Sequence, residues 1–262
     1  MAVIDSQPAA RALKAPVRNR YFHGKLLDVY HFQLETEYLN AKRYLLNRLV
    51  SGYGVVCGLD VECDPDNRHI VVAPGVAIDK WGREIIVPEK TRPIPIPDDL
   101  LAPPSGQGGT YRQPQQQGEE KEEEGVFRVL LCYHECESDP TPVLGGDCGT
   151  ADECAAGAIR ERYRITFKEG AAPPIRLSCH IPDLFRGDRL DYEALAKYVS
   201  EGCPEPPADP CIPLANLRPG GDGCDPERID IAIRPVVYAN DLLLEIILSL
   251  LQEERDDHRH AK

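Results

Sequence analysis

The fold is organised around the segment from Arg20 to Val61, RYFHGKLLDVYHFQLETEYLNAKRYLLNRLVSGYGVVCGLDV. Asp28 is a good helix N-cap, and no proline follows it before Val50, so we expect one long helix there. Apolar residues recur at spacings of four, three, four and four, which line one face of a helix. This stripe consists of Leu34, Tyr38, Ala41, Leu45 and Leu49.

Glycines and a strand pattern follow the helix. Gly52 and Gly54 supply the backbone freedom for a helix C-cap and a sharp reversal. From Val55 to Val61 every second residue is apolar, which is typical of a strand with one buried face. Further strands are expected at 69–73, 76–78 and 83–87, with a hairpin loop at 79–82.

The composition argues against several classes of function. The chain has 262 residues and a net charge of −13. An acidic chain is poorly suited to nucleic acid or anionic lipid, so we expect no nucleic-acid partner and no direct membrane insertion. The start of the chain does not resemble a secretory signal peptide, which favours assembly in the cytoplasm, with lysis as the route of release.

We expect an α+β fold in a single domain from residue 20 to residue 252. A long N-terminal helix would pack on a mainly antiparallel, β-sandwich-like body with long loops and a short C-terminal helix. Residues 1–19 lack periodicity and are expected to form a flexible arm, and residues 253–262 a charged tail. The segment 101–125 is rich in Gly, Gln and Glu and is expected to be a disordered loop inserted in the domain.

The ten cysteines leave three possibilities open. Reduced thiols and metal ligands are the usual states of cysteine in the cytoplasm. The third possibility is that disulfides form after the protein has left the cytoplasm. Thiolate and imidazole suit a structural zinc ion, and five such residues lie within 23 positions, although their spacing matches no standard zinc knuckle. They are Cys132, His134, Cys136, Cys148 and Cys154.

A second group of cysteines lies among prolines and glycines, where paired thiols would staple loops together. It includes Cys203, Cys211 and Cys224, and we expect at least one of the two groups to be cross-linked by a disulfide or by zinc. Cys57 and Cys63 continue the apolar strand pattern, so we expect them to be small buried hydrophobic residues.

Motifs in the first third of the chain resemble those of a known family. They are Tyr21-Phe22-x-Gly24-x-Leu26-Leu27, Asn47-Arg48, Gly52-Tyr53-Gly54-Val55-Val56-Cys57-Gly58-Leu59 and Pro74-Gly75-Val76-Ala77-Ile78-Asp79-x-x-Gly82-Arg83-Glu84-Ile85. In them the chain resembles accessory baseplate or fibre-type structural components of phage-tail-like contractile injection systems. The resemblance is dense over residues 20–90 and fainter beyond.

The resemblance implies a non-enzymatic protein that is oligomeric in the particle and binds baseplate, sheath or fibre subunits. It brings no catalytic residues and no cofactor, and the chain has no G-x-S-x-G, P-loop or H-E-x-x-H motif. The alternative function is a carbohydrate- or cell-surface-binding fibre module. The residues expected at an interface are Tyr21, Phe22, Leu34, Tyr38, Leu45, Leu49 and Trp81.

Two features of the 79–84 hairpin remain open. Trp81 is an interface anchor if its ring is exposed, and a packing residue if the ring folds inward. Asp79 and Glu84 are expected to pair with Lys80 or Arg83 at the surface, where such pairs contribute about 0–1 kcal/mol.

Overall fold

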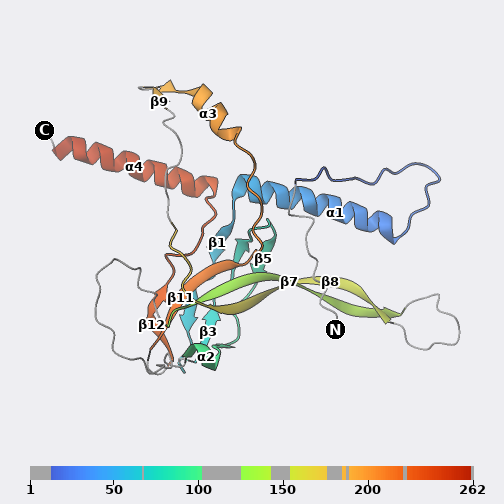
Figure 1. The fold of residues 1–262 in the computed structure, drawn as a ribbon, viewed down its shortest axis with the longest axis horizontal. Helices are drawn as coiled ribbons and strands as arrows, with labels where there is room; N and C mark the ends of the chain where they lie inside the picture. The colour runs from blue at the N-terminus through green and yellow to red at the C-terminus, as the bar shows by residue number, and fades with distance from the viewer. Residues whose placement is uncertain are drawn as a thin grey trace, which may run out of the picture.

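The computed structural model describes residues 13–66, 68–101, 125–142, 154–175, 185–186, 189–220 and 223–260. Most of the expected N-terminal arm and nearly all of the expected loop at 101–125 lie outside these residues. Within them, a β-sheet body carries three long projections (Figure 1). These are helix α1 (Val29–Leu46), helix α4 (Asn240–His260) and the hairpin of β7 (Phe127–Pro142) and β8 (Cys154–Glu169). The α+β fold class is confirmed.

The body consists of three antiparallel sheets around one core. Their strand orders are β1-β4-β5 (Gly54–Gly58, Gly75–Ile78, Glu84–Val87), β2-β3-β6 (Val61–Cys63, His69–Val72, Ile94–Pro95) and β12-β11-β7-β8, with β11 at Ile212–Gly220 and β12 at Gly223–Asp230. All three sheets contribute buried side chains to one cluster, for example Ile85, Ile70 and Leu131. The remaining elements are the π-helical turn η2 (Asn47–Ser51), α2 (Asp98–Leu101), the ribbon β9–β10 (Phe185–Arg186, Arg189–Leu190) and α3 (Tyr192–Val199).

Helix α1 begins where the sequence predicts but does not pack as expected. Asp28 accepts a hydrogen bond from the backbone N–H of His31, and the His31 ring accepts one from the backbone N–H of Asp28. No residue of α1 is buried, and the predicted stripe is at most half-buried at Leu34, Tyr38 and Leu45. The structure therefore corrects the expected packing of this helix on the body: the sheets close the core among themselves, and α1 projects from it (Figure 1).

The predicted strand from Val55 to Val61 is split between two sheets. Gly58 and Leu59 both have left-handed backbone conformations, with φ of 65° and 61°, and they redirect the chain from β1 to β2. A Cβ atom at Gly58 would lie 2.1 Å from the Pro74 carbonyl oxygen, so only glycine fits there. A register shift after Val55 leaves Cys57 exposed, which corrects its expected burial.

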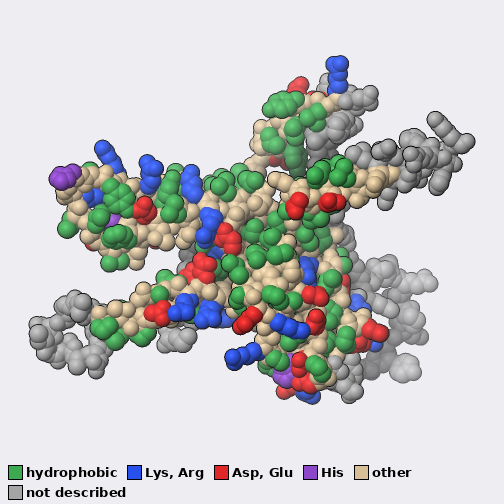
Figure 2. Space-filling model, turned by 180° about the vertical axis from the view of Figure 1, so that it is seen from behind, with side chains coloured by type: hydrophobic (Ala, Val, Ile, Leu, Met, Phe, Trp, Pro, Cys, Tyr) green, Lys and Arg blue, Asp and Glu red, His purple; other side chains and the backbone are tan. Residues whose placement is uncertain are grey.

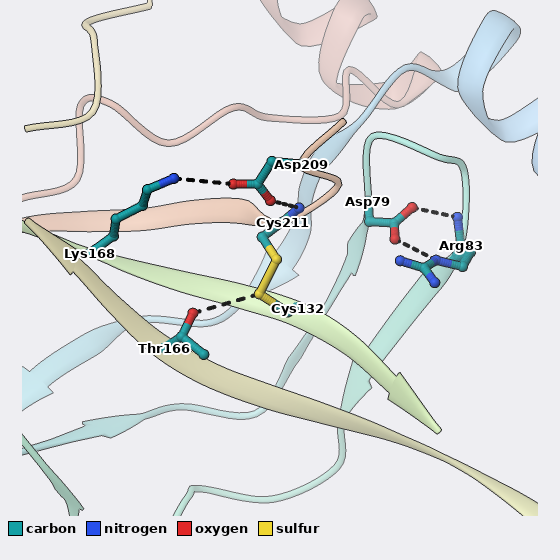
Figure 3. Close-up of a disulfide and its surroundings, with 7 residues drawn as sticks. All are labelled: Asp79, Arg83, Cys132, Thr166, Lys168, Asp209 and Cys211. Carbon is teal, nitrogen blue, oxygen red and sulfur yellow. Dashed lines mark hydrogen bonds and ion pairs between the residues drawn. A yellow bond between two sulfur atoms is a disulfide. The ribbon is translucent and has the colours of Figure 1, made fainter. Parts of the chain in front are cut away.

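Two disulfides brace the body. Cys63 in β2 is bonded to Cys224 in β12, 161 residues away, and Cys132 in β7 is bonded to Cys211, just before β11 (Figure 3). Cross-linking of the expected cysteine groups is thus confirmed, but the bonds join different groups instead of closing within one. Cys63 is a disulfide partner, which corrects the expectation of a free buried thiol.

The C-terminal helix is longer than expected. α4 continues to His260, so the segment predicted to be a loose charged tail is helical. Apolar side chains are visible along helices α1 and α4 on the face seen in Figure 2. Among the described residues, no helix combines the length and apolar character needed to cross a lipid bilayer.

The disulfides predict a specific thiol count. Denatured but unreduced protein should expose at most six free thiols, which is ten less the four in disulfides, and reduction should raise the count to ten. Replacing Cys63 and Cys224 by Ala should lower the free energy of unfolding by about 2–5 kcal/mol, because a long loop is released in the unfolded chain.

The matched control is Cys203→Ala, which removes an exposed free thiol and should leave the unfolding free energy unchanged. Ten titratable thiols before reduction, together with wild-type stability of the Cys63→Ala/Cys224→Ala protein, would show that the bonds do not form.

Candidate functional site

A tight turn between β4 and β5 is built around the buried carboxylate of Asp79. The backbone N–H of Asp79 donates to the Arg83 carbonyl at 2.8 Å, and that of Gly82 donates to the Asp79 carbonyl at 2.9 Å. Asp79 Oδ1 accepts from the backbone N–H groups of Trp81 and Arg83, both at 2.9 Å. The carboxylate therefore organises the whole turn, as Asp side chains do in turns of this kind.

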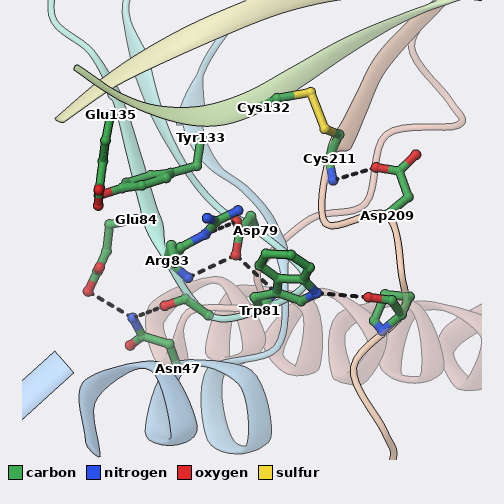
Figure 4. A network of polar contacts seen from close by, with 12 residues as sticks. Asn47, Asp79, Trp81, Arg83, Glu84, Cys132, Tyr133, Glu135, Asp209 and Cys211 are labelled. Atoms are coloured by element: carbon green, nitrogen blue, oxygen red, sulfur yellow. Dashed lines mark hydrogen bonds and ion pairs between the residues drawn. A yellow bond between two sulfur atoms is a disulfide. The ribbon is translucent and has the colours of Figure 1, made fainter. Parts of the chain in front are cut away.

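Arg83 neutralises this carboxylate inside the protein. Its Nε donates to Asp79 Oδ2 at 2.7 Å, and the two side chains are only 13% and 1% exposed. The guanidinium lies between two aromatic rings, 4.6 Å from the Trp81 ring centroid and 4.4 Å from that of Tyr133 (Figure 4). The ion pair of Asp79 and Arg83, which was expected at the surface, is thus buried, and its guanidinium stacks on two aromatic rings.

Burial also acts on the ionisable groups around the turn. It raises the pKa of Asp79 above its usual range, against the attraction of Arg83 and the hydrogen bonds that favour the ionised carboxylate. Burial likewise raises the pKa of Tyr133, whose hydroxyl donates to Glu135 Oε1 at 2.7 Å. Tyr133 is therefore a neutral hydrogen-bond donor at physiological pH.

The base of α1 is fastened to the same turn. Asn47 Nδ2 donates to the Gly82 carbonyl at 2.9 Å and to Glu84 Oε1 at 2.8 Å, and Arg43 Nε lies 3.2 Å from Glu84 Oε2. A Cβ atom at Gly82 would lie 2.1 Å from the Tyr44 carbonyl oxygen, so the helix approaches the turn too closely for any other residue. These contacts set the direction in which α1 leaves the body.

A proline-rich segment before β11 completes the site with three backbone carbonyls. Arg48 donates to the Pro204 carbonyl at 2.7 Å, and the Trp81 indole N–H donates to that of Pro207 at 2.8 Å. The backbone N–H of Lys80 donates to the Pro210 carbonyl at 3.1 Å, next to the Cys132–Cys211 disulfide. We call this assembly of Asn47, Asp79, Trp81, Arg83, Glu84 and Tyr133 the joint.

The expected interface residues separate into three groups. Tyr21 and Phe22 are 52% and 62% exposed, and Leu49 is 37% exposed. Leu34, Tyr38 and Leu45 are half-buried on one side of α1. Trp81 belongs to the joint: it folds inward and its N–H is used within the chain, so the structure does not support it as an anchor for a partner.

The expected zinc ligands do not form one site. Cys132 is in a disulfide, and His134 lies beside the Arg164 guanidinium, at 3.2–3.3 Å from its Nη2. In the ladder of β7 and β8, Cys136 lies opposite Arg160 and Cys154 lies opposite Pro142. Pro142 is six residues from Cys136 along β7, so the two cysteines are roughly 20 Å apart. Cys148 lies outside the described residues. The ligand set is therefore corrected for its described members.

Within the described part of the chain, only Asp64, Asp66 and His69 bring three potential metal-ligating atoms together. These three residues flank the turn between β2 and β3, and the His69 ring lies 2.6 Å from the Asp66 carboxylate. That hydrogen bond, together with the one from the Asp64 backbone N–H to the His69 carbonyl at 2.9 Å, accounts for their closeness without a metal.

The residues that sequence reasoning missed are Asn47 and Tyr133. Asn47 follows an amphipathic helix, and the sequence there predicts a solvent-exposed helix cap. Tyr133 continues an apolar strand pattern, which predicts a core residue. Neither pattern carries information about a partner 35 or more residues away in the chain. The close sequence Asp79-x-Trp81-x-Arg83 was the only signal of the joint.

Comparisons with known proteins leave the family open. No family model and no curated protein matches the chain. Among solved structures, a crystal structure of TssK is similar with a TM-score of 0.34 and 16% sequence identity. The match covers 82% of this chain but only 41% of the TssK chain. A likeness this weak carries no argument about function.

The joint predicts a large effect of Arg83→Met. Removing the guanidinium leaves the Asp79 carboxylate buried and unpaired, which should lower the free energy of unfolding by about 3–5 kcal/mol near neutral pH. Fluorescence of Trp81, the single tryptophan, should change as the cation leaves its ring.

The loss should shrink as the pH falls below neutral. Asp79 already has a raised pKa, and without Arg83 the pKa rises further, so acid protonates the buried carboxyl in the folded state and removes its charge. Arg160→Met is the matched control, because its ion pair with Asp139 is exposed on both sides, and its stability should stay near that of the wild type. Equal stability losses in the two variants would contradict the role of the joint.

Proposed function

We propose that the chain is a non-enzymatic structural component of a phage-tail-like contractile injection particle, at the periphery of the baseplate or at a fibre attachment point. One observation carries the proposal: among the described residues, α1 is bonded to the sheet body only near its C-terminal end, and none of its residues is buried. A helix that exposes apolar side chains from a braced body is suited to contact neighbouring subunits.

The family-like motifs support the proposal because they coincide with this architecture. Asn47, Gly82 and Glu84, all within those motifs, form the contacts that hold α1. Gly54 and Gly58, also within them, sit where a side chain would collide with the Pro235 and Pro74 carbonyl oxygens. The motif residues thus have packing and positioning roles, which is what an assembly component requires.

Assembly of this kind needs no strong single contact. A particle with rotational symmetry repeats the same interface many times, so modest contacts add through avidity. The β body and its disulfides would keep the arms in fixed positions, and the exposed residues before α1, Tyr21 and Phe22, would contact a neighbouring subunit.

The alternative function, glycan binding, has less support from the described surface. Two open grooves on the described surface have volumes of about 380 and 370 Å³, and neither is lined by Tyr or Trp. Aromatic rings usually provide the apolar platform of such sites. The groove residues are instead mostly charged or small, as at Arg228, Glu137 and Ala155.

Sedimentation of particles from the producing cells tests the proposal. The chain should sediment with sheath-containing particles, and Phe22→Asp should remain in the supernatant, because it places a charge in an apolar contact. Ile86→Asp, at a site equally exposed on the body, should sediment like the wild type. Both variants should keep the wild-type melting temperature.

Wild-type chain that never accompanies the particles would contradict the proposal. If the same purified chain bound immobilised glycans, the result would favour the fibre module instead.

A further inference from the structure

A second apolar stripe runs along α1, about 120° around the helix from the predicted one. Phe32, Leu39 and Leu46 recur every seven residues and are 58%, 61% and 60% exposed. A seven-residue repeat of apolar side chains is the pattern with which one helix packs along another. Among the described residues nothing buries this stripe, since no residue of α1 is buried.

Helix α4 has an even wider exposed apolar surface. At 3.6 residues per turn, the apolar side chains between residues 242 and 250 cover an arc of about 240°. A narrow polar strip of Asp241, Glu245 and Ser249 separates its edges. The exposed apolar residues are Leu242, Leu243, Leu244, Ile246, Ile247, Leu248 and Leu250.

The two helices leave the body from neighbouring points. Val237, three residues before α4, donates its backbone N–H to the carbonyl of Val55, which follows α1 and η2 closely. From there α1 and α4 extend in opposite directions (Figure 1). Their lengths of 18 and 21 residues correspond to about 27 and 32 Å, so either helix can cover the other.

We propose that a second copy of this chain covers both helices, with α4 of each copy lying antiparallel against α1 of the other. A two-fold rotation near the shared origin places α4 over the partner's α1 and, by the same operation, the partner's α4 over α1. Each copy then supplies one helix to each contact, and the assembly is closed.

The two-fold rotation sets the antiparallel direction, and the charges at the start of α4 suit it. It places Asp241 and Glu245, at the start of α4, beside Lys42 and Arg43 near the end of α1. A parallel arrangement would place these carboxylates beside the acidic first half of α1, which contains Glu35 and Glu37. Antiparallel helix dipoles also attract.

The contact area is sufficient for a specific dimer. A strip of about 27 Å by about 10 Å on each helix gives about 270 Å², and four such strips give about 1,100 Å² in total. This exceeds the roughly 1,000 Å² that a specific interface needs. The inference goes beyond the proposed function, because the dimer would form in the purified chain without any particle.

Light scattering on the purified full chain tests the dimer. The wild type should have twice the monomer mass at micromolar concentration, and Leu39→Asp and Ile247→Asp should both be monomeric. Ile159→Asp, on the projecting β7–β8 hairpin and also 61% exposed, is the matched control and should remain dimeric. All three substituted residues are exposed, so circular dichroism should show wild-type folding in each variant.

A mixing experiment is specific for the reciprocal arrangement. In a mixture of Leu39→Asp with Ile247→Asp, one of the two contacts carries both substitutions and the other carries none. The two monomeric variants should therefore associate with each other, more weakly than wild type. Likewise, Lys42→Glu and Glu245→Lys should each weaken the dimer, and the double variant should restore it.

Three results would overturn the proposal. A wild-type chain that stays monomeric at about 100 μM would leave the helices to another protein, because a functional dimer associates far more tightly. A Leu39→Asp protein that remains dimeric would place the contact elsewhere. Failure of the two monomeric variants to associate would favour pairing of like helices, α1 with α1 and α4 with α4.

Discussion

The arrangement of this protein depends on one buried ion pair, that of Asp79 and Arg83. A carboxylate with 1% exposure is tolerated only because a guanidinium and two backbone N–H groups satisfy it. Such a pair contributes little net stability compared with apolar packing, but it permits only one geometry of the turn. Because α1, β7 and the proline-rich segment are all bonded to that turn, one geometry of the turn means one placement of each.

The sequence predicts the local elements well and their partners poorly. The Asp28 cap, the strands β3 to β5 and the glycine-dependent turns follow from short-range rules, so they could be recognised from a few residues. The stripe of Leu34, Tyr38 and Leu45 shows that α1 has an apolar face, but not whether that face meets its own sheet or another chain. The Cys63–Cys224 bond joins residues 161 positions apart, which no spacing rule anticipates. For the joint, the pattern Asp79-x-Trp81-x-Arg83 identifies three of the six participants but not their burial.

The disulfides follow the packing of the strands. Cys132 follows Leu131, whose partner in the ladder of β7 and β11 is Ile212, and Cys211 directly precedes Ile212. Strands β2 and β12, which carry Cys63 and Cys224, also contact each other. Each bond therefore joins cysteines that the packing of the sheets already brings together.

The joint holds α1 in a fixed direction relative to the sheet body. Pulsed electron spin resonance between labels at Thr36 on α1 and Ile86 on β5 measures this directly. Genetically encoded label sites avoid the free cysteines, and dilution with unlabelled chain removes signals between copies. A joint that fixes the direction of α1 should give a single narrow distance distribution in the wild type. A broad distribution, with α1 sampling many directions from its base, would contradict it.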